Sequence, residues 1–237
     1  MKIIIINGSP RTPGFTAALL HGMEETLKQK GVEVDFFDLG KLTMAQCAGC
    51  CACYTTGHCH LNDDAERLSL LIKDADGLIL GSPTYASNVS GLMKLLIDRG
   101  HFVIEQLLTG KYCVTVATGE NYGNRDASKV LKKLVLYSGG RLTRSIAMNA
   151  PFNSITITSE KKTNLNEPAT TASLQISMIS RKVADHLYTA ISKKKKNPIQ
   201  KLHHAVIFSF GIKPFVKRKG SKYKGVLNKW KELGIYG

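Results

Sequence analysis

The sequence lacks any apolar run long enough to cross a membrane. The four isoleucines at positions 3–6, for example, fall far short of the roughly 20 apolar residues that a membrane helix requires. The opening MKIIIINGSP also lacks the longer apolar region and small-residue cleavage site of a secretory signal. We therefore expect a cytoplasmic protein without a membrane span, in which clustered cysteines bind metal or do redox chemistry more often than they form structural disulfides.

Acidic residues are also scarce, since 18 Asp and Glu stand against 33 Lys and Arg, a net charge of +15. The excess is uneven. Residues 193–237 hold 13 Lys and Arg and one acid, Glu232, which gives +12 and leaves 20 − 17 = +3 for residues 1–192. We predict a nearly balanced body, 1–192, followed by a basic, helical C-terminal extension, 193–237. With 43% hydrophobic residues, the chain can bury one sizeable core.

Segments with the hydrophobic pattern of strands alternate with segments that have the pattern of helices. The predicted strands cover 2–7, 32–39, 77–85, 111–119 and 141–150, and the predicted helices cover 15–31, 63–75, 88–108, 125–140 and 169–194. Asp63 or Asp64 is the expected N-cap of the helix that follows it. This alternation predicts an α/β fold, a doubly wound parallel sheet of five strands in the flavodoxin-like order 2-1-3-4-5 with helices on both faces.

Three loops leave the carboxyl ends of these strands, at 8–16, 82–90 and 118–124, where such sheets bind ligands. The first contains neither G-x-G-x-x-G nor G-K-[ST], which excludes the dinucleotide and Walker A fingerprints. Ser9, Arg11 and Thr16 beside a helix N-terminus suit a phosphate monoester. The alternative is an ordinary strand–helix turn with a Ser cap.

The other two loops offer walls for a flat heterocycle. Pro83, Tyr85 and Asn88 lie on one loop, while Tyr122 and Gly123 follow Gly119 on the other. A phosphate cradle between two such loops matches FMN, with the phosphate in the first loop and the isoalloxazine between the others. Alternatively, the two tyrosines are ordinary surface residues.

Several motifs in order carry a family resemblance. GSPRTPGFT at 8–16, DD at 63–64, ADGLILGSPTYASNVSGLMKLLIDR at 75–99 and the cysteine loop at 46–59 resemble the NADPH-dependent FMN reductase family, and within it the iron–sulfur flavoprotein branch. The resemblance covers residues 1 to about 190. It implies FMN as cofactor, electron transfer from a reduced nicotinamide or a protein donor, and a homodimer or homotetramer.

The resemblance also implies which residues contact FMN. The phosphate-binding loop of the family is matched by Ser9, Arg11 and Thr16, and we add the neighbouring Phe15 and Ala17 as candidates. The ring-contacting loop is matched by Pro83, Thr84, Tyr85 and Ala86. The third loop is matched by Thr118 and Gly119. Phe15 departs from the family pattern, where a polar residue such as Asn is common, so any phosphate contact there would use its N–H. No catalytic side chain is expected, because the flavin carries the chemistry.

Five of the six cysteines fall between residues 46 and 59. Cys47, Cys50 and Cys53 are separated by two residues each, with Cys59 following, a spacing typical of ferredoxins that favours a [4Fe–4S] cluster over zinc. Cys51 is out of register, and Cys113 is expected to be a buried small hydrophobe. The alternatives are reduced thiols, a disulfide formed in air, or a zinc site joined by histidines.

The basic extension has three competing uses: nucleic-acid binding, contact with an anionic membrane surface, or packing on the body or a neighbouring subunit. The resemblance favours packing, and we expect no nucleic-acid partner. The predicted function is an FMN-dependent oxidoreductase that passes electrons from NAD(P)H to a small acceptor such as a flavin or quinone, with a [4Fe–4S] cluster as an optional relay. The alternative is a non-enzymatic electron carrier reduced by ferredoxin.

Overall fold

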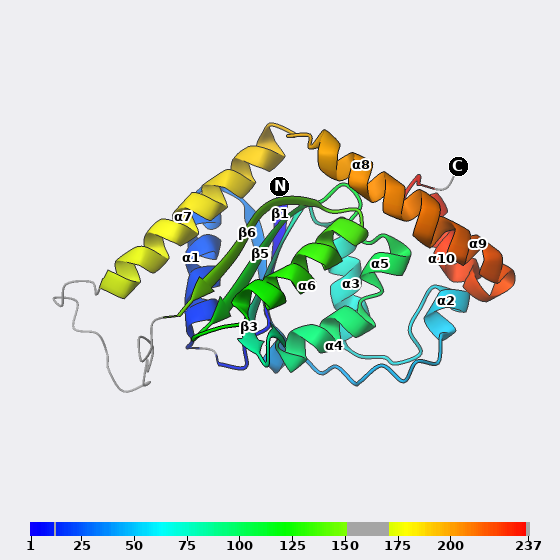
Figure 1. The fold of residues 1–237 in the computed structure, drawn as a ribbon, viewed down its shortest axis with the longest axis horizontal. Helices are drawn as coiled ribbons and strands as arrows, with labels where there is room; N and C mark the ends of the chain where they lie inside the picture. The colour runs from blue at the N-terminus through cyan, green and yellow to red at the C-terminus, as the bar shows by residue number, and fades with distance from the viewer. Residues whose placement is uncertain (12, 151–170, 236–237) are drawn as a thin grey trace.

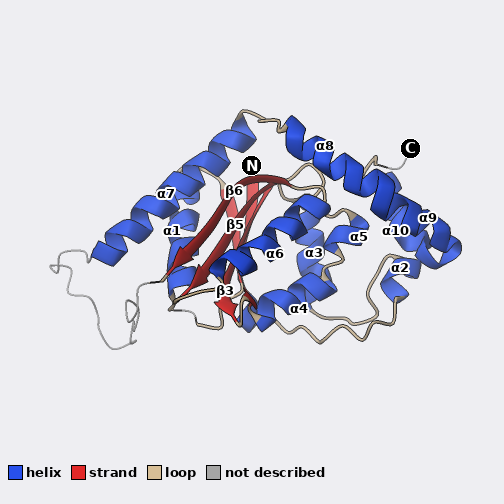
Figure 2. Ribbon diagram, in the orientation of Figure 1, coloured by secondary structure: helices blue, strands red, loops and turns tan. Residues whose placement is uncertain are grey.

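The computed structural model describes residues 1–11, 13–150 and 171–235. Its centre is a parallel sheet in the order β2-β1-β3-β5-β6, with one short strand, β4, paired antiparallel to β3 (Figure 2). The bounds are β1 Lys2–Asn7, β2 Glu33–Asp38, β3 Gly77–Tyr85, β4 Asn88–Val89, β5 Tyr112–Gly119 and β6 Arg141–Asn149. The five parallel strands have the predicted flavodoxin-like order, so this prediction is confirmed.

Helices cover both faces of the sheet, as expected (Figure 1). Helices α1 (Phe15–Lys28) and α7 (Thr171–Ser192) cover one face, and α3 (Asp64–Asp74), α4 (Gly91–Arg99), α5 (Phe102–Glu105) and α6 (Asn124–Tyr137) cover the other. The β1 run explains the two layers, because successive strand residues point to opposite faces. Ile3 and Ile5 pack in the α1–α7 core, whereas Ile4 and Ile6 pack in the other core.

The predicted helix over 88–108 is wrong. Asn88 and Val89 instead form β4, after a turn in which Ala86 and Ser87 have φ values of 47° and 59°. Helix α4 begins after Ser90, whose hydroxyl accepts a hydrogen bond from Met93 N, and ends at Arg99. His101, with φ of 51°, then breaks the chain before the short α5. The left-handed residues at both ends prevent one continuous helix. The other predicted helices agree with the structure to within a few residues, although residues 169–170 lie outside the described part.

The C-terminal extension is helical and lies along one end of the body (Figure 1). It comprises α8 (Pro198–Ile207), the π-helical turn η2 (Phe208–Ile212), α9 (Lys213–Lys219), the 3₁₀ turn η3 (Gly220–Tyr223) and α10 (Lys224–Glu232). The Gln200 side chain donates to Leu142 O and accepts from Leu142 N at the edge strand β6. Trp230 is fully buried in a small third core with Phe208. Within the described residues, no helix is long and apolar enough to span a membrane.

Candidate flavin site and cysteine loop

Three loops meet at the carboxyl edge of the sheet. Because β1, β3 and β5 are parallel and Asn7 pairs with Gly81 and Pro83 with Thr118, their ends lie at the same edge. Gly8 N donates to Gly81 O at 2.8 Å, and Ser90 Oγ donates to Gly8 O at 2.6 Å. The first and second loops are therefore joined directly by hydrogen bonds.

The first loop leaves a helix N-terminus available to an anion. Gly14 is the N-cap of α1 and has no side chain to accept from the first-turn amides, and that turn carries no acid. Ser9 Oγ accepts from Arg11 N and donates to Arg11 O, so this hydroxyl organises the loop. Arg11 itself is exposed. The first-turn N–H groups and the Arg11 guanidinium are thus the elements suited to a phosphate.

Thr16 and Thr118 connect the first loop to the third. Their Oγ1 atoms lie 2.7 Å apart in a buried hydrogen bond between α1 and the end of β5. Ala17 is buried beside them, and Phe15 packs against the core on the α1 side of the sheet. Two residues that are 102 positions apart in sequence therefore fix where α1 begins relative to the sheet edge.

The second loop carries a buried polar atom that has no protein partner. Thr84 Oγ1 is buried, and no hydrogen-bond partner for it occurs in the described parts of the chain. Such a group normally finds a partner. Pro83 next to it is half-buried, Tyr85 is exposed, and Asn88 Oδ1 accepts a hydrogen bond from Val89 N. The free hydroxyl fits a polar ligand at this edge.

The third loop closes against the second. Gly123, the N-cap of α6, has φ of 82°, and a Cβ there would lie 2.8 Å from Ser87 Cα. A Cβ on Gly119 would lie 3.6 Å from Thr84 Cβ. Tyr122 is exposed at the tip of the loop. Only glycine fits at position 123, so the contact between these loops depends on it.

The cysteine loop contains the short helix α2 (Ala52–Thr56), which packs on α10 at the end of the molecule opposite α1 and α7 (Figure 1). Cys47 and Cys50 are exposed, Cys53 lies on α2, and Cys53 and Cys59 are half-buried. All are free thiols, and no three His, Cys, Asp or Glu side chains in the described chain are grouped to hold a metal ion. The four candidate ligands match a [4Fe–4S] cluster in chemistry and number, but their sulfurs do not converge. Cys113 is fully buried in the core.

A buried ion pair fastens both ends of the cysteine loop. Asp63 receives two hydrogen bonds from the Arg99 guanidinium, at 2.7 and 2.8 Å, and their side chains are only 9% and 1% exposed. Asp63 also accepts from Ala45 N and caps α3 through Ala65 N, while Arg99 donates to Ala45 O. Burial acts to raise the pKa of Asp63, but Arg99 and the two backbone amides hold that pKa below its usual value.

Cationic groups lie beside two of the thiols. Arg99 Nη2 is 3.5 Å from Cys59 Sγ. Burial lowers the pKa of His101, but hydrogen bonds to Cys53 and Glu105 raise it to about 10. His101 is therefore cationic at neutral pH.

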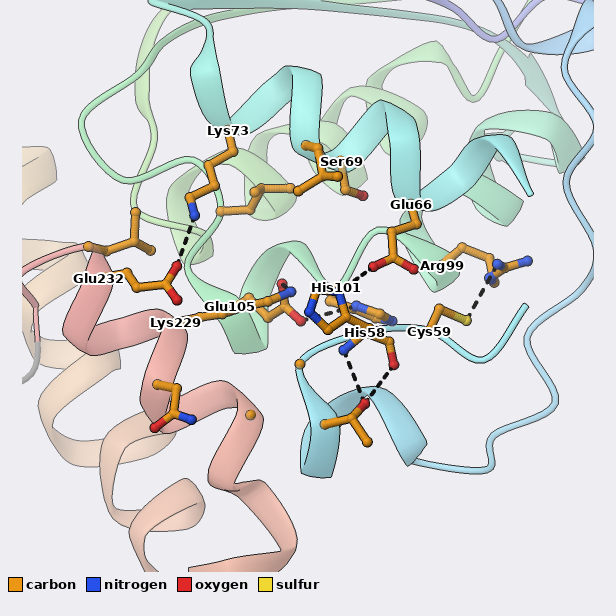
Figure 3. A pocket seen from close by; sticks show the side chains of 17 residues that line it. His58, Cys59, Glu66, Ser69, Lys73, Arg99, His101, Glu105, Lys229 and Glu232 are labelled. Atoms are coloured by element: carbon orange, nitrogen blue, oxygen red, sulfur yellow. Dashed lines mark hydrogen bonds and ion pairs between the residues drawn. The ribbon is translucent and has the colours of Figure 1, made fainter. Parts of the chain in front are cut away.

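The extension forms one wall of a cavity of about 310 Å³ beside this loop (Figure 3). Its charged side chains are largely paired with one another. His58 contacts Glu66 at 2.6 Å, Lys73 of α3 contacts Glu232 at 2.9 Å, and Lys229 of α10 contacts Glu105 at 2.7 Å. The pairs made by Glu232 and Lys229 join α10 to the body across the cavity, whereas the His58–Glu66 pair joins the cysteine loop to α3.

Comparison with known proteins agrees with this geometry. Residues 1–152 match the NADPH-dependent FMN reductase family. An iron–sulfur flavoprotein of Clostridioides difficile (strain 630) is 33% identical over 99% of this chain and 100% of its own length. The chain belongs to the NADPH-dependent FMN reductase family.

Other relatives extend this picture. An iron–sulfur flavoprotein of Methanocaldococcus jannaschii is 39% identical over 42% of this chain and 51% of its own length. The apo structure of an NADH:FMN oxidoreductase has a TM-score of 0.53 at 17% identity, with 84% of this chain and 92% of that chain covered. The similarity to the NADH:FMN oxidoreductase structure concerns the fold alone. Membership of the family makes the chain a flavin oxidoreductase.

Sequence analysis missed some residues that position the cysteine loop of this family member. The expected helix cap at Asp63 or Asp64 is confirmed for Asp63, whereas the sequence alone does not identify a partner for Arg99. In the structure Lys94 pairs with Asp98, and Arg99 reaches Asp63, 36 residues away. An isolated Arg at the end of an apolar helix was the available signal, but one sequence does not give its partner.

Proposed function

We propose that the protein is an FMN-dependent oxidoreductase that takes electrons from NAD(P)H and passes them to a small acceptor such as a flavin or quinone. The observation that carries the proposal is the buried Thr16–Thr118 hydrogen bond, which with the Ser90–Gly8 bond joins the three edge loops into one site. Family membership supports the same assignment. Bound FMN supplies the two-electron chemistry.

The residues of the three edge loops would bind FMN and orient it. The first-turn amides of α1, with Phe15 and Ala17 contributing through N–H, and the Arg11 side chain hold the phosphate. Ser9 keeps that loop in shape through its two bonds to Arg11. The unpartnered Thr84 hydroxyl would bond a polar group of the flavin, and the exposed Tyr85 and Tyr122 would line the ring and limit access of water. Pro83, Ala86, Asn88, Thr118, Gly119 and Gly123 shape the walls.

Titration of the flavin-free protein with FMN tests the proposal. We expect quenching of flavin fluorescence at one equivalent, and steady-state turnover with NADPH or NADH. A protein that binds FMN but turns over only with reduced ferredoxin would instead be an electron carrier, an alternative that the iron–sulfur relatives favour. Failure to bind FMN contradicts both.

Gly123→Ala is expected to raise the Kd for FMN about tenfold or more. The new Cβ meets backbone at Ser87, so the second and third loops must separate. Gly31→Ala is the matched control, because Gly31 has a similar φ of 74° but open space around its Cβ position. It imposes the same backbone strain without a clash. Equal FMN affinity in the two variants would contradict the assigned loop contact.

We further propose that Cys47, Cys50, Cys53 and Cys59 hold a [4Fe–4S] cluster after the thiols close around it. The Arg99 guanidinium, 3.5 Å from Cys59 Sγ, supports this, because four thiolates give such a cluster a net negative charge. The names of the relatives support it as well. When bound, the cluster supplies one-electron chemistry.

Cys50→Ala is expected to lose most of the iron and sulfide found in anaerobically purified protein, because one of four ligands is missing. Cys51→Ala, on the adjacent exposed residue, is the control and should keep its iron. FMN content should be unchanged in both variants, since both residues are exposed and neither belongs to the three edge loops assigned to FMN. Full iron retention in Cys50→Ala would contradict the cluster assignment.

A further inference from the structure

The outer face of the C-terminal extension carries an apolar stripe that no described residue covers. Phe210 is 83% exposed and Ile199 79%, with Leu202 and Val206 also exposed between them. These residues recur at helical spacing along α8 and η2, so they share one face. The opposite face is the one attached to the body, since Gln200 bonds Leu142, His204 bonds Gln106, and Phe208 packs on Trp230.

Cations stand at both ends of this stripe. Residues 193–196 are four consecutive exposed lysines just before α8, and Lys217, Arg218 and Lys219 are exposed at the end of α9. Lys201 is exposed beside Leu202. The extension as a whole carries 13 − 1 = +12. In Figure 1, α8 and α9 form an outer edge of the molecule.

We propose that this face docks on an anionic lipid surface, with Ile199, Leu202, Val206 and Phe210 entering the boundary between headgroups and acyl chains and the lysines contacting anionic headgroups. An amphipathic helix of apolar side chains flanked by lysines has this chemistry. The helix lies on the membrane and does not cross it. The site is separate from the flavin edge.

The net charge of the extension favours an anionic lipid surface over a second copy of the chain as the partner of the stripe. A symmetric dimer through the stripe would bring two +12 segments together, and the remaining +3 body offers no compensating acidic excess. Nucleic acid would satisfy the lysines but would leave the aliphatic side chains without an apolar partner. An anionic membrane surface satisfies both the charges and the apolar stripe.

Co-sedimentation of the holoprotein with lipid vesicles tests the proposal. We expect binding to vesicles of phosphatidylcholine mixed with phosphatidylglycerol, weaker binding at high salt, and little binding to phosphatidylcholine alone. The double variant Leu202→Ser with Phe210→Ser should weaken binding at least about tenfold. Both side chains are exposed, so folding and flavin content should be unchanged. Met178→Ser, on the 72% exposed Met178 of α7, is the matched control and should bind as the parent does.

The charge contribution is tested by replacing Lys195, Lys196 and Arg218 with Gln, which should weaken binding to the anionic vesicles. Several results would overturn the proposal: no vesicle binding, equal binding to neutral vesicles, or unchanged binding by the double serine variant. A double variant with a lower mass in solution and unchanged vesicle binding would assign the stripe to a second copy. Binding of duplex DNA without vesicle binding would assign it to nucleic acid.

Discussion

Replacing Asp63 with Asn is expected to lower the free energy of unfolding by about 3–5 kcal/mol, the cost of leaving a buried charge without its partner. Arg99 is 1% exposed and donates hydrogen bonds to both carboxylate oxygens of Asp63. The substitution also weakens the hydrogen bonds to Ala45 N and Ala65 N. Equilibrium unfolding in urea measures the change.

Asp98→Asn is the matched control. Asp98 pairs with Lys94 at 2.5 Å, but the two side chains are 44% and 52% exposed. An exposed pair of this kind contributes about 0.2–1 kcal/mol. A similar loss of unfolding free energy in the two Asn variants would contradict a stabilising role for the buried Asp63–Arg99 pair.

The same pair predicts a dependence on pH. The folded-state pKa of Asp63 lies below its unfolded value, so its stabilising effect is complete above the unfolded pKa of about 3.9 and declines as the pH falls through the folded pKa. The stability difference between the parent and Asp63→Asn should therefore shrink in acid and stay constant between neutral and mildly alkaline pH.

Gly225→Ala is expected to detach α10 from the cysteine loop. A Cβ at Gly225 would lie 2.1 Å from Gly57 N and 2.7 Å from Gly57 Cα. Both are backbone atoms and cannot rotate away, so overpacking costs about 1–3 kcal/mol unless the helix moves. Two neighbouring contacts would then be lost: the hydrogen bond from Thr55 Oγ1 to Lys222 O and the stacking of Tyr54 on Tyr223.

Hydrogen exchange measures this effect as faster exchange at residues 52–57 and 224–232, with iron content as a second reading. Gly211→Ala is the control, because Gly211 lies in the same extension with open space at its Cβ position. Alanine there should stabilise the helix by about 0.5–1 kcal/mol. Unchanged exchange in Gly225→Ala would show that α10 tolerates the extra atom without moving.

Local pattern was enough to predict the sheet. The β1 run is apolar on both faces, the signature of a covered parallel strand, and the alternation of strands and helices left few topologies. The same reasoning failed over 88–108, where the composition is helical but Asn88 and Val89 pair with β3 and His101 adopts a left-handed conformation.

The candidate site was likewise predicted only in part. Placement of Ser9, Thr84 and Gly123 on edge loops followed from strand order. Two features did not follow: the Ser9 hydroxyl is used within its own loop, and Arg99 and Asp63 meet from separate elements. A single sequence holds no record of partners that lie tens of residues apart.

The contact between α10 and the cysteine loop has a consequence for protein synthesis. Thr55 bonds to Lys222 across 167 residues. A ribosome must therefore build the whole sheet and the extension before this support reaches the loop. Until then α2 lacks the support of α10, so stable binding of the proposed [4Fe–4S] cluster is expected to follow translation of α10 and not to accompany emergence of the cysteines.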